Sequence, residues 1–263
     1  MIRLFSILIL AVAGAVVLSA QCPAGKVKSD RKLDKAKLPS RLQFAIQEHG
    51  DRLLKPGKER IQMTGLLSRK KGADVPFQLV QELPDLIRID IQGANGAETL
   101  AFDGEKQWQD KGALKKEDGD LLEALIYDTP ERFFQAQANS VPMRSLGSGF
   151  RLDGQIGRPY SGPVYDIYTI VDTIKGRGNA RPQTKYYFVN SSTHLLERVE
   201  YNDTSNGDAF TQMHVEGWLQ VGSDRAPRVI RRLENGTETA RLSVNSFTLG
   251  PTRADSIFCM PGK

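Results

Sequence analysis

Alternation of apolar and polar residues with a period of two runs through most of the chain and limits its fold more than any other feature. In "VPFQLVQE", Phe77 and Leu79 fall on one side of the segment, and in "LIRIDI" Ile87 and Ile89 do the same. This pattern is typical of strands that bury one face in a core. Further runs that favour strands cover residues 165–174, 185–190, 195–201, 209–221, 228–234 and 239–249.

Turn signals separate these runs and indicate how the strands pair. They are Asn206-Gly207, Gly222-Ser223 and Asn235-Gly236. In "TLAFDGEKQW", Asp103-Gly104 predicts a hairpin with a type I′ turn. Strands joined by short turns pair antiparallel, and an antiparallel sheet of roughly ten strands curls toward a barrel. We therefore predict a mainly β (α+β) fold, in which a curved antiparallel sheet forms an incomplete β-barrel covered by a few helices.

Helical spacing occurs in two places. In "PSRLQFAIQEHGDRLL" (39–54) apolar residues recur at steps of three and four, and Ser40 is the expected N-cap. In "EDGDLLEALIYDTPERFFQAQ" (117–137) a first helix begins with Asp118 and Asp120, whose charges favour a helix N-terminus. Pro130 then ends this helix and starts a second one. The Gly-rich segment 144–163 lies between strand candidates and matches no phosphate-binding pattern.

The N-terminus predicts export. Arg3, the apolar stretch of residues 4–18 and the small pair Ser19-Ala20 have the layout of a secretory signal peptide. We expect residues 1–20 to be removed, residues 21–38 to form a basic flexible leader, and residues 39–263 to form one domain. The alternatives are an uncleaved N-terminal anchor and a lipid anchor on Cys22, although Gln21 fits poorly before a lipidated cysteine.

The two cysteines stand near opposite ends of the chain. In an oxidising compartment Cys22 and Cys259 could pair and tie the termini together, and two free thiols are the alternative. Neither cysteine has a neighbouring Cys or His that would suggest a zinc site.

No group of residues points to catalysis. His49, His194 and His214 are far apart, fit no metal-binding motif and are expected at the surface or half-buried. No serine lies in a G-x-S-x-G motif. The formal net charge of +5 comes partly from the leader, and aromatic residues do not alternate with the basic ones, so nothing indicates nucleic-acid binding. We expect no enzyme, metal or cofactor; a hydrolase of unrecognised type is the remaining catalytic alternative.

Large apolar side chains are candidates for a pocket between the sheet and the helices, because every second residue of a curved strand faces the concave side. Ordinary core packing is the alternative for each of them. The candidates are Phe77, Leu79, Ile89, Trp108, Leu125, Phe133, Phe134 and Trp218.

Residues 60–91, "RIQMTGLLSRKKGADVPFQLVQELPDLIRIDI", followed by "LAFDGEKQWQ" (100–109), resemble the opening strands of bacterial LolA/LolB-like lipoprotein-sorting proteins. The segment "YYFVNSSTHLLERVEY" (186–201) resembles their later strand-turn-strand, and "LSVNSFTLGPTRADSIFCMP" (242–261) resembles their closing strand and loop. The resemblance lies in turns and aromatic positions and covers most of residues 58–261.

The resemblance implies a monomeric periplasmic carrier that holds acyl chains of lipids or lipoproteins in an apolar cavity, with envelope membrane proteins that deliver or accept the cargo. Each buried methylene contributes about 0.8 kcal/mol, so one long chain offers on the order of 10 kcal/mol before ordering costs. The alternative is a non-catalytic interaction module of the cell envelope with the same fold and a filled core.

Overall fold

The computed structural model describes residues 35–50, 59–70, 72–82, 85–94, 96–138, 141–150, 162–175, 180–251 and 255–260. Twelve strands form one antiparallel sheet in the order β5-β4-β3-β2-β1-β14-β13-β10-β9-β8-β7-β6, with β5 and β6 at its edges. The strands are β1 (Glu59–Arg69), β2 (Val75–Glu82), β3 (Leu86–Gly93), β4 (Gly96–Asp103), β5 (Gln107–Gln109), β6 (Met143–Phe150), β7 (Val164–Ile174), β8 (Arg181–Asn190), β9 (Leu196–Asp203), β10 (Ala209–Glu216), β13 (Val229–Glu234) and β14 (Thr237–Pro251).

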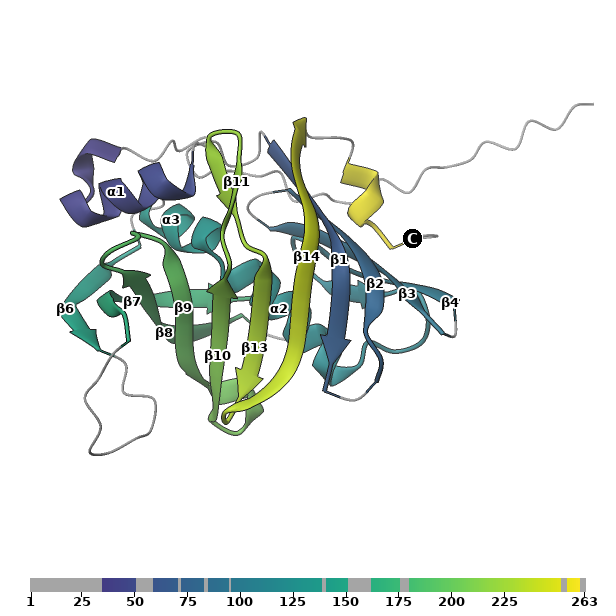
Figure 1. Ribbon diagram of the computed structural model, residues 1–263. Helices are drawn as coiled ribbons and strands as arrows, with labels where there is room; N and C mark the ends of the chain where they lie inside the picture. Colours follow the sequence, from purple (N-terminus) through teal and green to yellow (C-terminus); the bar gives the residue numbers. More distant parts are fainter. Residues whose placement is uncertain are drawn as a thin grey trace, which may run out of the picture.

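The sheet consists of two meanders joined where the first and the last strand pair. β1 lies antiparallel to β14, with Ile61 opposite Leu249 and Leu67 opposite Leu242. A separate two-stranded hairpin, β11 (Leu219–Val221) and β12 (Asp224–Ala226), projects between β10 and β13. Figure 1 shows the sheet curving around α2. The predicted fold class is confirmed.

In the described part of the chain, three α-helices accompany the sheet: α1 (Ser40–His49), α2 (Lys116–Tyr127) and α3 (Pro130–Ala138). The expected N-cap of α1 is wrong, because Pro39 holds that position and its carbonyl oxygen accepts from the N–H groups of Leu42 and Gln43. The break before α3 is confirmed, and the Thr129 hydroxyl accepts from the N–H of Arg132. Among the described residues no helix is long and apolar enough to cross a membrane.

The hairpin at Asp103-Gly104 is confirmed, but its turn differs from the type I′ expectation. Only Gly104 has a positive φ, of 96°, whereas type I′ needs two such residues. Asp103 acts through its side chain, because its Oδ1 accepts from the N–H groups of Glu105 at 2.9 Å and Lys106 at 2.8 Å. The turn is therefore held by a carboxylate that replaces backbone acceptors.

His49 is fully buried, which corrects the expectation of a surface or half-buried residue. Its Nδ1 donates to the carbonyl oxygen of Ala45 at 2.7 Å, and its Nε2 accepts from the N–H of Leu196 at 3.1 Å. The ring therefore joins the end of α1 to the start of β9. The partner on β9 is 147 positions away, so no local pattern signals it.

Candidate functional site

The apolar interior lies between the sheet and the corner where α2 meets α3. A space of about 30 Å³ remains there, room for no more than a few water molecules. Its apolar lining includes Met63, Leu79, Leu125, Met213, Trp218 and Phe247. Asp128 and Thr129, from the junction of the two helices, lie at its border.

The predicted pocket residues divide into three groups. Leu79, Leu125 and Trp218 line the small space. Phe77, Ile89, Phe133 and Phe134 belong to the same buried core and pack within it. The ring centroids of Phe133 and Phe134 are 5.0 Å apart, and Phe133 is 4.7 Å from the ring of Tyr187. Trp108 alone forms the third group, because it belongs neither to the lining of the small space nor to this core.

Trp108 lies on the opposite face of the sheet. It pairs with Ala101, and because Leu100 and Phe102 on either side of Ala101 belong to the main core, Ala101 and Trp108 face the other way. The Nε1 of Trp108 donates to the carbonyl oxygen of Phe258 at 2.8 Å. Phe258 is part of the short helix η4 (Asp255–Phe258), which packs on this face. The structure therefore separates Trp108 from the other seven candidates, because a distant segment covers the outer face.

A buried ion pair anchors the corner between α2 and α3 to the sheet. Lys185 of β8 donates to Oδ1 of Asp128 at 2.5 Å and to the carbonyl oxygen of Tyr127 at 3.2 Å, and both charged side chains are 1% exposed. The ammonium also lies 5.0 Å from the ring centroid of Tyr201, whose hydroxyl donates to Oδ2 of Asp128 at 2.9 Å. Burial, reinforced by the charge of Asp128, raises the pKa of Tyr201 well above its ordinary value, so this hydroxyl stays a donor.

A second ion pair holds α3. Arg132 donates to both carboxylate oxygens of Asp172 on β7, at 2.9 and 2.7 Å. Burial alone would raise the pKa of Asp172, but the hydrogen bonds and the charge of Arg132 lower it below its ordinary value. Unlike the pair at Lys185, this one reaches the rim, since the Arg132 side chain is 16% exposed. The two pairs together fix the helical cover on the sheet.

Sequence reasoning missed both ion pairs, although one signal was present. In β8, Gln183, Lys185, Tyr187 and Val189 are all buried at alternate positions, so a lysine stands in a row that faces the core. A lysine in such a row needs a buried partner. The sequence does not say which of the many carboxylates is that partner.

In the described part of the chain, no cluster of three or more His, Cys, Asp or Glu residues could hold a metal ion. Cys259 directly follows η4, whereas Cys22 lies outside the described residues, so their pairing stays a prediction. The signal segment 1–20 and residues 21–34 of the basic leader lie outside them too.

An open, curved antiparallel sheet that wraps around helices defines the LolA-like fold, and solved structures of that class align with this chain. A LolA superfamily protein from Nitrosomonas europaea has a TM-score of 0.53 and 13% identity, covering 84% of this chain and 96% of that one. A domain from Vibrio parahaemolyticus, provisionally assigned as an outer membrane lipoprotein-sorting protein, has a TM-score of 0.50 and 10% identity, covering 86% and 95%.

The chain therefore has a LolA-like fold, as the sequence resemblance predicted. No family model matches the sequence, and no curated protein matches it. At these identities the likeness concerns the fold alone.

Proposed function

We propose that this protein is a non-catalytic, periplasmic carrier that binds acyl chains of lipids or lipoproteins between the concave face of the sheet and the α2–α3 cover. Three observations support the proposal: the export pattern at the N-terminus, the LolA-like fold, and the apolar space under the helical corner. The apolar space carries the argument, because it lies where the sheet and two separately anchored helices meet. Cargo delivery and acceptance by envelope membrane proteins, with the carrier as a monomer, belong to the same proposal.

The space of about 30 Å³ is far smaller than the roughly 300–1,000 Å³ of ordinary ligand pockets. Under the proposal this is the closed, unloaded arrangement, and an acyl chain enters when α3 moves away from the sheet. Met63 and Met213 suit this role, because methionine side chains are flexible and repack around different apolar shapes.

The mobility of α3 offers a direct test. Asp172→Asn removes the charge that holds Arg132 and should loosen α3 without altering the apolar lining. The matched control is Asp166→Asn, which weakens the contacts of Asp166 with Arg41 of α1 and with Ser148 of β6. Both variants exchange a buried carboxylate for an amide, but only the first releases the cover.

The measurement is association of a fluorescent fatty acid with the mature chain, together with mass spectrometry of lipids extracted after purification without detergent. The proposal expects binding to the wild type, faster association with Asp172→Asn, and an unchanged rate with Asp166→Asn. Absence of binding by all three folded proteins, with no co-purified lipid, would refute it.

That negative result would support the second candidate, a cell-envelope interaction module with a filled core. The observation in its favour is the same small volume, since Phe133, Phe134 and Ile89 are completely buried and leave almost no room. Such a core gives structural support only, and the function would then depend on the outer surface.

A further inference from the structure

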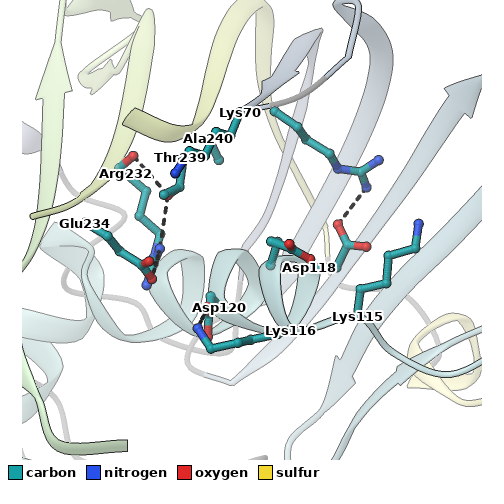
Figure 2. Close-up of a pocket in the computed structure, with 11 residues that line it drawn as sticks. Lys70, Lys115, Lys116, Asp118, Asp120, Arg232, Glu234, Thr239 and Ala240 are labelled. Atoms are coloured by element: carbon teal, nitrogen blue, oxygen red, sulfur yellow. Dashed lines mark hydrogen bonds and ion pairs between the residues drawn. The ribbon is translucent and has the colours of Figure 1, made fainter. Parts of the chain in front are cut away.

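A second cavity, of about 450 Å³, lies at the N-terminal end of α2. Its walls come from the end of β1, the start of α2, and the strands β13 and β14, as Figure 2 shows. Apart from Thr239 and Ala240, every residue that lines it is charged. It is thus distinct in position and in chemistry from the apolar space at the other end of α2.

Three of the cavity's acidic residues form ion pairs with neighbouring cations. In each pair a side-chain nitrogen lies 2.8 Å from a carboxylate oxygen. The pairs are Arg69–Asp118, Lys116–Asp120 and Arg232–Glu234. The Arg69 guanidinium also contacts Glu98 at 2.8 Å, outside the lining. The charge of Arg69 is therefore shared by two carboxylates, whereas the Lys116–Asp120 and Arg232–Glu234 pairs are each balanced.

Among the lining side chains that form no described ion pair, ammonium groups outnumber carboxylates. Lys70 and Lys115 are exposed lining residues, and neither forms an ion pair with any residue that the structure describes. Glu117 is the one lining carboxylate without such a pair in the same part of the chain. Two free ammonium groups therefore face one free carboxylate.

The unused hydrogen-bonding atoms are donors as well. Nε of Arg69 and Nε of Arg232 are buried and donate to no described acceptor, and Arg232 as a whole is only 4% exposed. The N-cap of α2, Lys115, provides no side-chain cap, and the first intrahelical bond runs from Gly119 to the carbonyl oxygen of Lys115. The preceding N–H groups of the helix therefore also lack an intrahelical acceptor.

Two unpaired ammonium groups and unused hydrogen-bond donors both favour a ligand rich in acceptor oxygens. A phosphate group has this chemistry, and the N-terminus of a helix favours it through its dipole and free N–H groups. The volume of the cavity falls within the ordinary range for small-molecule sites, so it accommodates more than the phosphate itself.

We propose that the cavity at the N-terminus of α2 binds a phosphate-bearing ligand, with Lys70, Lys115 and the first N–H groups of α2 as its donors. The phosphate belongs either to a soluble phosphomonoester or to a lipid headgroup. This site does not depend on the proposed acyl-chain function, because it uses the opposite end of α2.

The test compares the mature wild-type chain with the double variant Lys70→Gln/Lys115→Gln and with the control Lys106→Gln, an exposed lysine outside the cavity. Calorimetric titration with inorganic phosphate measures affinity, and circular dichroism confirms that each variant is folded. Loss of two charge-assisted hydrogen bonds should weaken phosphate binding at least about tenfold in the double variant and leave the control unchanged.

Two further probes identify the source of the phosphate. Binding of glycerol 3-phosphate, but not of phosphatidylglycerol vesicles, assigns the site to a soluble ligand. Vesicle binding that disappears in the double variant, but not in the control, assigns it to a lipid headgroup. The proposal is overturned if inorganic phosphate does not bind the wild type, or if the double variant binds it as well as the wild type does.

Discussion

Replacing Lys185 with methionine tests whether the buried ion pair holds the helical corner on the sheet. Methionine keeps much of the length and volume of the side chain but removes the ammonium that contacts Asp128 and the carbonyl oxygen of Tyr127. Asp128, whose side chain is 1% exposed, would then keep a hydrogen bond from the hydroxyl of Tyr201 but lose its counter-charge. We expect Lys185→Met to lower the free energy of unfolding strongly.

The magnitude follows from the burial of both groups. Breaking a buried ion pair from one side destabilises a protein by about 3–5 kcal/mol, because the other charge stays in a poorly solvating environment. For a chain of this size about 1 kcal/mol corresponds to roughly 2–4 °C in Tm, so a decrease of about 6–20 °C is expected. The exposed control Lys106→Met should stay within about 0.5 kcal/mol of the wild type.

A double-mutant cycle separates the pair from its surroundings. Asp128→Asn alone leaves the ammonium of Lys185 without its counter-charge, whereas the double variant leaves neither charge. The double variant should therefore be less destabilised than the sum of the single variants, by well over about 1 kcal/mol. Urea unfolding followed by tryptophan fluorescence and circular dichroism gives these values. Additive effects, or a loss below about 1 kcal/mol for Lys185→Met, would contradict the assignment of this pair as the anchor.

Three further predictions concern other contacts. The pKa of Asp172 is lowered in the folded state, so its ion pair stabilises the fold above the ordinary carboxyl pKa of 3.8, and this stability is lost as the pH falls through the folded pKa. In Asp172→Asn the midpoint of urea unfolding should therefore decrease less at acidic pH than in the wild type. Gly65→Ala should destabilise the fold by about 3 kcal/mol or more in urea, because its Cβ would lie 1.9 Å from the carbonyl oxygen of Ser243. His49→Leu leaves the N–H of Leu196 without its acceptor and should lower the free energy of unfolding by about 1–3 kcal/mol, with faster hydrogen exchange at that amide.

The strands and the helical break were predictable because their causes are local. Alternation placed Phe77, Leu79 and Ile89 on the core side, and Pro130 marked the start of α3. β6 was missed, because its glycines hide the alternation, and Gly147, with a φ of 88°, lies where the register shifts. Local patterns therefore indicate elements but not their irregularities.

Pairing across long distances was not predictable in the same way. Trp108 is a large apolar residue of the kind expected in a pocket. It is instead buried on the outer face, where η4, 150 positions later in the chain, covers it. The partner of Lys185 is 57 positions away on another element. In both cases the side chain's environment is decided by a segment that the neighbouring sequence does not contain.

The two ion pairs of the helical cover differ in how readily they can open. Lys185 and Asp128 are both 1% exposed, so separating them requires water to enter the core. The Arg132 side chain is 16% exposed, so water can replace the contacts of Arg132 with Asp172 more cheaply. Under the proposed function, α3 therefore moves first, about the junction at Asp128–Thr129, while the end of α2 stays anchored. An interaction module with a filled core does not need one ion pair to open more easily than the other. Ligand uptake that depends on α3 and not on α1 therefore distinguishes the two candidate functions.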